Sequence, residues 1–240
     1  MSKPLTFGSL FAGIGGIDLG FERAGMTCKW QVEIDPFCRQ VLAKHWPEVP
    51  RHDDIRTFIN PPHVDIVVGG FPCKQTSNGA AIHGRRNGLA GKDSGLWYEM
   101  LRVIKECRPR VVVVENVAGV ASWSETITGG LEDAGYGVTE FRIAASEFGA
   151  IHSRRRVFFV ANTDRERLSV AWQKRSPEAD AQERRAIAGD HWDAGSSEFR
   201  RMAHGISGAL DRRARIERLG NAVVPQVAEY IGRRIMEIEQ

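Results

Sequence analysis

The sequence predicts an α/β protein whose core is a doubly wound, mostly parallel β-sheet. Short segments rich in β-branched and aromatic residues alternate along the chain with segments whose apolar residues recur every three or four positions. Most of the short segments close with Gly, Asp or Glu, as strands do where they enter a turn. Alternating strands and helices favour a parallel sheet, and 240 residues are enough for one such domain with a small appendage.

These patterns place the elements in a defined order. The expected strands are Leu5–Phe11, Cys28–Glu33, Val64–Val68, Val111–Glu115, Val138–Ile143 and Val157–Ala161. The expected helices are Ile17–Arg23, Phe37–His45, Leu96–Glu106, Ile127–Ala134 and Pro225–Met236, the last with a proline at its first position. Between about Asn162 and Leu219 the alternation stops, and Trp172, Trp192 and Phe199 are sparse anchors among polar residues. We interpret these anchors as a small core rather than as stacking platforms.

Composition excludes several classes of protein. The four cysteines lack the CxxC spacing of a zinc site or a disulfide framework, so we expect no metal and a reducing, cytoplasmic location. No apolar run approaches the roughly 18 residues that span a bilayer, so we expect no membrane segment. A net charge of +3 is too small to argue for nucleic acid. Arginine clusters such as 154–156 suit phosphates or base edges, although a solvated surface is the simpler reading of any single cluster.

A glycine-rich turn follows the first expected strand. Phe11-Ala12-Gly13-Ile14-Gly15-Gly16 precedes a helical pattern, so its glycines let a ligand approach the backbone and the helix N-terminus offers free N–H groups. A dinucleotide fingerprint would need glycine at Asp18. Glu33, at the end of the second strand, is placed to bind ribose hydroxyls, and Asp54 could reach an adenine amine. Any one feature could be an ordinary turn, but the ordered set predicts a nucleoside-containing cofactor.

Cys73 differs from the other three cysteines. Cys28, Cys38 and Cys107 lie in apolar segments and are expected to be buried packing groups. Cys73 follows Pro72 in a polar, glycine-containing loop after an expected strand, at the edge of the sheet where ligands bind. A thiol with an ordinary pKa near ~8.5 is mostly protonated at neutral pH, so a nucleophilic role needs nearby positive charge, for which the arginine clusters are candidates.

Two further stretches carry charged groups to the same edge. The apolar run from 111 to 114 ends in Glu115, which is either a reactive carboxylate or a loop-stabilising acid. His152-Ser153-Arg154-Arg155-Arg156 precedes the last expected strand, and Arg154 and Arg156 share a face if that stretch is extended. A solvated basic turn is the alternative there.

Taken together, these stretches resemble the DNA cytosine-C5 methyltransferase family. FAGIGG resembles its first cofactor motif, GGFPC its nucleophile motif, ENV its glutamate motif, HSRRR its basic motif, and LGNAVVP (219–225) its closing motif, all in the family's order. The resemblance implies the Rossmann-like fold of S-adenosylmethionine-dependent methyltransferases. It also implies S-adenosylmethionine as cofactor and double-stranded DNA as partner, leaves a companion restriction endonuclease open, and is compatible with a monomer. The implied cofactor residues are Phe11, Gly13, Gly15, Gly16, Glu33, Asp54, Leu96 and Asn221.

The resemblance also implies a chemistry for the charged residues. Cys73 would attack C6 of cytosine as a thiolate, Glu115 would hold N3 and the exocyclic amine, and Arg156 would bind O2. Arg154 would support the nucleophile loop or a phosphate. The base must leave the duplex to be reached, and the glycine-containing loop 75–92 looks suited to closing over it.

Departures from the family pattern leave alternatives open. Lys74 stands where the family usually has glutamine, and His152 occupies another glutamine position. We expect a catalytic and cofactor-binding domain at 1–162, a reduced target-recognition segment at 163–218, and a closing segment at 219–240 that packs back on the catalytic domain. A silent DNA-binding relative, or an RNA cytosine-C5 methyltransferase, is the alternative function.

Overall fold

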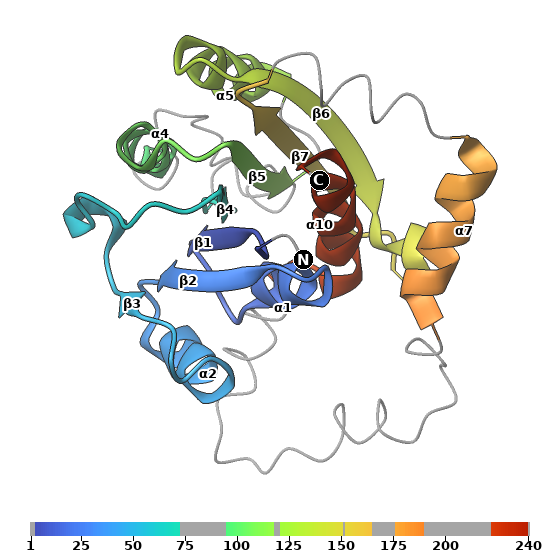
Figure 1. Ribbon diagram of the computed structural model, residues 1–240, viewed down its shortest axis with the longest axis horizontal. Coiled ribbons are helices and arrows are strands. Elements are labelled where there is room, and N and C mark those ends of the chain that lie inside the picture. Colours follow the sequence, from blue (N-terminus) through green and yellow to red (C-terminus); the bar gives the residue numbers. More distant parts are fainter. Residues whose placement is uncertain are drawn as a thin grey trace, which may run out of the picture.

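The computed structural model describes residues 3–72, 95–117, 121–150, 152–164, 176–189 and 222–239, with side chains of the helix at 121–133 from Ser124 onward. It contains a seven-stranded sheet with the order β3-β2-β1-β4-β5-β7-β6 (Figure 1). The strands are β1 (Thr6–Leu10), β2 (Thr27–Val32), β3 (Arg51–His52), β4 (Ile66–Gly69), β5 (Val111–Val117), β6 (Gly137–Ala144) and β7 (Arg155–Asn162). The predicted α/β fold class is confirmed.

Helices connect the strands. The described helices are α1 (Gly16–Arg23), α2 (Pro36–His45), α4 (Leu96–Cys107), α5 (Ala121–Asp133), α7 (Pro177–Ala188) and α10 (Pro225–Glu239), with 3₁₀ turns η1 (Ile55–Thr57) and η3 (Ala145–Phe148). The expected helices between strands are all present, and α5 begins six residues earlier than its apolar pattern predicted. The first residues of α5 show no apolar periodicity, so the pattern predicted only the part of the helix from Ile127 onward.

The sheet is mostly parallel, as predicted, with one reversed strand. β1, β2, β3, β4 and β5 pair in parallel, whereas β7 pairs antiparallel with both β5 and β6. Only η3 and a short turn join β6 to β7, and a connection of that length returns the chain antiparallel. β3 was not predicted, because a strand of two residues is too short to show alternation.

Apolar layers cover both faces of the sheet. Phe21 of α1 and Ile231 of α10 belong to one buried cluster, and Trp97 of α4 and Leu131 of α5 belong to the other. The residues of the run 111–114 alternate between the two clusters, which explains why that strand is apolar throughout. Cys28, Cys38 and Cys107 are buried free thiols, as predicted.

Helix α10 packs closely along α1 (Figure 1). A Cβ added at Gly20 of α1 would lie 2.5 Å from the Cβ of Ala228, and one at Gly232 would lie 2.8 Å from the Cβ of Ala24. These distances are shorter than the closest approach of two non-bonded carbon atoms, so neither position can carry a side chain without a shift of its neighbours. Small residues therefore let the last described helix lie against the first.

Helix α7 was not expected, because the sequence predicted an irregular segment from 163 to 218. Ser176 accepts a hydrogen bond from the Ala179 N–H at 3.2 Å, and a proline begins the helix. The apolar face is narrow, with Ile187 as its buried residue, and this explains why periodicity missed it. Tyr230 donates a hydrogen bond to Asp180, so α7 is fixed to α10. The three expected anchors of this segment (Trp172, Trp192 and Phe199) lie outside the described residues.

A buried carboxyl group lies beneath the glycine-rich turn. Asp18 of α1 is fully buried and accepts hydrogen bonds from the Ser9 hydroxyl at 3.0 Å and the Gln31 amide at 2.8 Å. Burial, which these bonds only partly offset, raises the pKa of Asp18 to about 6.

Replacing Asp18 with asparagine should change how stability depends on pH. The pKa of Asp18 is about 6 in the folded protein and 3.8 in the unfolded chain. A carboxyl group of this kind contributes its full stabilisation below pH 3.8 and loses it as the pH rises to about 6. The free energy of unfolding of the unaltered protein should therefore fall between about pH 4 and pH 6, by up to about 3 kcal/mol. Urea denaturation at several pH values should show that this slope disappears in Asp18→Asn; an unchanged slope would contradict the assignment.

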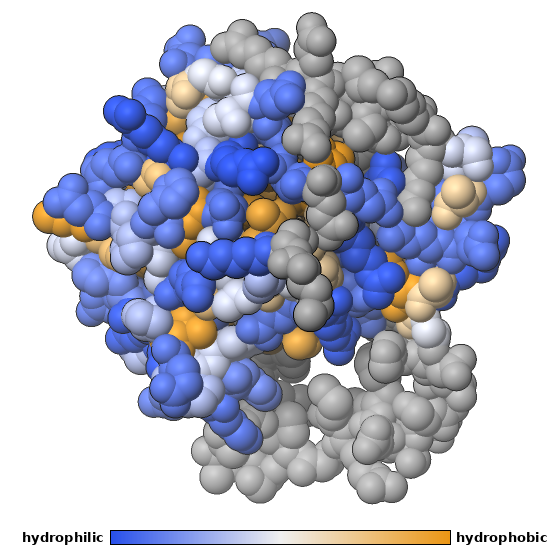
Figure 2. All heavy atoms as spheres, viewed as in Figure 1, coloured by the Kyte–Doolittle hydropathy of each residue, from blue (hydrophilic) through white to orange (hydrophobic). Residues whose placement is uncertain are grey.

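The described surface is predominantly polar. Figure 2 shows one face, on which hydrophilic side chains predominate and apolar ones occur in small groups. Among the residues with a described side chain, the large exposed hydrophobic ones are Leu19, Ile34, Ile59 and Tyr98. Within the described ranges, no helix is long and apolar enough to cross a membrane, and no group of three potential metal ligands occurs.

Candidate active site

The predicted site residues that the structure describes lie at one edge of the sheet. Parallel strands end at the same edge, so the turn after β1, Glu33 after β2, residues 70–72 after β4 and the end of β5 all lie there. β7 runs in the opposite direction, and its first residues face the end of β5, with Arg156 opposite Val117. The reversed strand therefore brings the basic stretch to the edge where the parallel strands end.

The glycine-rich turn adopts a backbone that favours glycine. Gly13 and Gly15 have φ values of 57° and 84°, and Phe11 adopts a φ of 54° despite its side chain. The Gly15 N–H donates to the Ala12 carbonyl at 2.9 Å, which closes the turn just before α1 begins. A Cβ at Gly13 would meet no described atom within 4 Å, so the turn leaves open space beside the backbone.

Backbone N–H groups hold Glu33 beside this turn. Its two carboxylate oxygens accept hydrogen bonds from the N–H groups of Gly13 at 2.7 Å and Asp35 at 2.8 Å. A carboxylate has about four acceptor positions, so two remain for ligand hydroxyls. Asp35 also caps α2 by accepting from the Phe37 N–H at 2.8 Å. Sequence reasoning missed this supporting residue, although an aspartate directly before a proline is a common start of a helix.

Asp54 lies in the neighbouring loop and is paired with Arg56. The Arg56 side chain donates to both carboxylate oxygens, the shortest contact being 2.6 Å. These hydrogen bonds lower the pKa of Asp54 to about 2, so it is ionised at neutral pH. Leu96 begins α4 and packs, with Phe11, against the apolar cluster on that face of the sheet.

The loop that leads to the predicted nucleophile is fixed against β5. The Asn116 side-chain amide donates to the Phe71 carbonyl at 3.3 Å and accepts from the Val117 N–H at 2.8 Å. A Cβ at Gly70 would lie 2.5 Å from a carboxylate oxygen of Glu115, so the Gly70 backbone and the Glu115 side chain are in contact. Sequence reasoning missed the role of Asn116, which only the folded contact reveals. Cys73 itself lies outside the described residues.

Glu115 and Arg156 form a buried pair. The Glu115 side chain is 10% exposed, and its Oε1 lies 2.9 Å from Nε of Arg156. These two atoms are at ion-pair distance, but neither makes a well-aligned hydrogen bond within the described part of the chain. Burial raises the pKa of Glu115, while Arg156 and Arg154 oppose that rise. The carboxyl group is therefore protonated more readily than an ordinary glutamate and still has acceptor positions for a ligand.

Arg154 links the basic stretch to the closing segment. Its backbone has a φ of 30°, and its guanidinium donates to the Ala222 carbonyl. Burial and the neighbouring Arg156 lower its pKa, an effect that Glu115 opposes. Asn221, the cofactor residue expected beside Ala222, lies outside the described residues.

A cleft of about 890 Å³ lies between the start of α1, the basic stretch before β7 and the closing segment. Its walls include Gly15, Gly16, Arg154, Arg156 and Val223. A Cβ at Gly16 would lie 2.2 Å from the Val223 carbonyl, so the glycine-rich turn and the closing segment are in direct contact. The end of the glycine-rich turn therefore opens into the same space as Arg156, predicted to bind the base, and Arg154, predicted to support the nucleophile loop or a phosphate. Glu33, Asp54 and Glu115 are not among the residues that line this cleft.

Comparisons with known proteins agree with this arrangement. The family model described as C-5 cytosine-specific DNA methylase matches residues 5–199. Type II methyltransferase M.AquIA of Picosynechococcus is 34% identical over 186 residues, which cover 68% of this chain and 73% of that protein. Type II methyltransferase M.BsuFI of Bacillus subtilis is 35% identical over 164 residues, which cover 65% of this chain and 39% of that protein. The chain thus spans much of one relative and well under half of another.

Solved structures have the same fold. A DNA modification methyltransferase encoded within an E. coli prophage is 27% identical, with a TM-score of 0.52 over 66% of this chain and 46% of that chain. A mutant of DNMT2 from Spodoptera frugiperda has a TM-score of 0.52 over 67% of this chain and 50% of that one. At 17% identity, the second likeness concerns the fold alone.

Proposed function

Because the chain belongs to the C-5 cytosine-specific DNA methylase family, we propose that it transfers a methyl group from S-adenosylmethionine to C5 of cytosine in double-stranded DNA. The proposal includes a transient bond between the Cys73 sulfur and the base. Its main support is the buried Glu115 carboxyl, which pairs with Arg156 and touches Gly70, three residues before Cys73.

The described residues fit S-adenosylmethionine. The open space beside Gly13 and the free acceptor positions of Glu33 suit a ribose, and the ionised Asp54 suits an adenine amine. Phe11 and Leu96 would contact the apolar faces of the ligand, and Gly15 and Gly16 would keep the α1 N-terminus accessible. Asn221 would complete the site from the closing segment. When bound, the cofactor supplies a methyl group on a positively charged sulfur.

The chain's own residues would make the base reactive. The Cys73 thiolate forms a bond to C6, and the electron pair of the C5–C6 bond moves into the ring towards N3 and O2. Glu115, whose raised pKa favours the protonated form, donates a proton to N3, and Arg156 donates hydrogen bonds to O2. C5 thereby becomes nucleophilic enough to accept the methyl group. The N3 proton then returns to Glu115, and water takes up the C5 proton. The electron pair of the C5–H bond re-forms the C5–C6 double bond and expels the Cys73 thiolate.

Arg154 and Arg156 would also favour the thiolate form of Cys73. Cationic groups near a cysteine lower its pKa, and both guanidinium groups lie at the edge of the sheet to which the nucleophile loop leads. The target base must be rotated out of the duplex, at a cost of a few kcal/mol. We assign reading of the DNA sequence to 163–218 and completion of the cofactor site to 219–240, with residues 1–162 as the catalytic part.

Methyl transfer can be tested directly. The protein is incubated with tritium-methyl S-adenosylmethionine and either genomic DNA of mixed sequence or tRNA, and the label in each polymer is counted. Label in DNA is expected. DNA containing 5-fluorocytosine should also trap the protein covalently, because fluorine at C5 blocks the final elimination.

Other outcomes would replace the proposal. Binding of S-adenosylmethionine without label in any DNA would favour a silent DNA-binding relative. Label confined to tRNA would indicate an RNA methyltransferase.

A further inference from the structure

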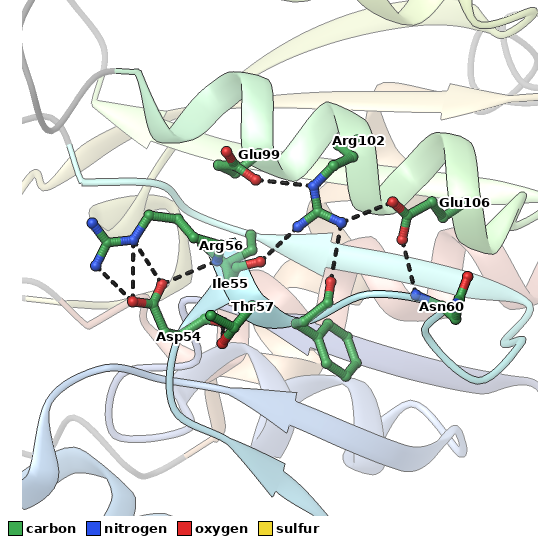
Figure 3. A network of polar contacts seen from close by, with 9 residues as sticks. Asp54, Ile55, Arg56, Thr57, Asn60, Glu99, Arg102 and Glu106 are labelled. Atoms are coloured by element: carbon green, nitrogen blue, oxygen red, sulfur yellow. Dashed lines mark hydrogen bonds and ion pairs between the residues drawn. The ribbon is translucent and has the colours of Figure 1, made fainter.

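Arg102 of α4 binds the backbone of the loop that follows Asp54 (Figure 3). Its guanidinium donates to the Ile55 carbonyl at 2.7 Å through Nη2 and to the Phe58 carbonyl at 3.1 Å through Nη1. The same helix begins with Leu96, six residues earlier. One side chain thus connects the helix that carries Leu96 to the loop that carries Asp54.

Two carboxylates on α4 hold this guanidinium in place. Arg102 donates to Glu99 through Nε and to Glu106 through Nη1, both at 2.9 Å, and its side chain is 29% exposed. The second oxygen of Glu106 accepts from the Asn60 N–H at 3.1 Å. The loop is therefore bound to α4 at both ends, by Arg102 at Ile55 and by Glu106 at Asn60 (Figure 3).

We propose that Arg102 is a positioning residue for recognition of the adenine ring. By fixing the loop on α4, it holds the Asp54 carboxylate at a set distance from Leu96. This inference rests on the proposed function, in which Asp54 binds the adenine amine and Leu96 contacts an apolar face of the same ligand. Arg102 itself is not expected to touch the ligand, since its N–H groups are directed at two backbone carbonyls of the loop and two carboxylates of α4.

The role requires arginine rather than any cation. A guanidinium presents several N–H groups in a fixed plane and can bind two carbonyls and two carboxylates at once, whereas an ammonium on a flexible stem cannot match that arrangement. The loop has other anchors, because Ile55 is buried and the Phe58 ring packs 5.1 Å from the Trp30 ring. Arg102→Lys should therefore fold while its loop shifts.

The test compares two ligands that differ at the adenine amine. S-Adenosylhomocysteine and S-inosylhomocysteine, in which an oxygen replaces the amino group, are titrated calorimetrically into the unaltered protein and into Arg102→Lys. The unaltered protein should prefer the adenosine compound, because the Asp54 carboxylate accepts from its amine. Arg102→Lys should bind that compound about tenfold more weakly, as expected for loss of a charged hydrogen bond. Its preference between the two ligands should shrink, with kcat at saturating cofactor little changed.

Two further variants complete the experiment. Arg233→Lys is the matched control, because Arg233 is 44% exposed on α10 and, among the described residues, pairs with Glu229 of the same helix. This variant should retain both affinities. Glu106→Gln leaves Arg102 in place but weakens one of the two carboxylate bonds that hold its guanidinium, so it should also reduce the preference for the adenosine compound. It serves as the test variant if Arg102→Lys does not fold.

The outcomes separate the inference from the proposed function. The inference would be overturned if Arg102→Lys and Glu106→Gln both kept the normal preference between the two ligands. It would also be overturned if the affinity for both ligands fell equally, since a purely structural role predicts that result. If the unaltered protein binds neither compound, the proposed function fails, and the inference fails with it.

Discussion

Replacing Cys73 with alanine should abolish methyl transfer to DNA, lowering kcat by about a thousandfold or more. Cytosine C5 is a poor nucleophile until a group adds to C6, and alanine offers no such group. Arg156 and Glu115 would remain, but they stabilise charge that develops only after the sulfur has bonded to the ring. Cofactor affinity should be nearly unchanged, because the proposed cofactor contacts are elsewhere.

The measurement is single-turnover transfer of a tritiated methyl group, together with covalent trapping on 5-fluorocytosine DNA. Cys107→Ala provides the matched control, because Cys107 is a buried thiol at the end of α4, away from the glycine-rich turn. That control should transfer and trap normally. More than a tenth of the normal rate in Cys73→Ala would rule out the covalent route.

Glu115→Gln should lower kcat by more than about tenfold, within the range usual for acid–base groups. Glutamine has nearly the same shape but cannot deliver a proton to N3, and it leaves the Arg156 guanidinium without its charged partner. Burial raises the pKa of Glu115, so its protonated form is the acid. Activity of the unaltered protein should therefore fall as pH rises through that raised pKa.

The pH profile of kcat distinguishes loss of the acid from general damage. The falling limb assigned to Glu115 should be absent from the profile of Glu115→Gln. Glu140→Gln is a suitable control, because Glu140 lies on β6 and pairs with Arg142 on the same strand. A normal rate in Glu115→Gln would overturn the role given to this carboxyl.

Sequence predicted most of the fold because most of its elements bury an apolar face. β5 is the clearest case, since its run of valines is covered on both sides. β3 and α7 were missed for the opposite reason: β3 has two residues, and α7 buries little besides Ile187. The start of α7 could have been found from Ser176 and the following proline, which form a helix-capping pattern.

The predicted site was incomplete for a different reason. Glu33, Glu115 and Arg156 could be named because their positions relative to strands are visible in the sequence. Asn116 and Arg102 could not, because their roles consist of contacts with backbone carbonyls 45 and 44 to 47 residues away. Backbone groups leave no mark on the sequence, so no pattern of residue types could predict these bonds.

Contact between two stretches that lie far apart in the sequence also sets the order in which the candidate site is completed. The Val223 carbonyl lies against Gly16, and the Ala222 carbonyl accepts from Arg154. During translation, residues 1–162 leave the ribosome before either carbonyl exists, so the nascent sheet has an unfinished cleft. We therefore expect this wall of the cleft to form only after residues 222 and 223 have emerged, so that a chain interrupted before them would carry the sheet without a closed cleft.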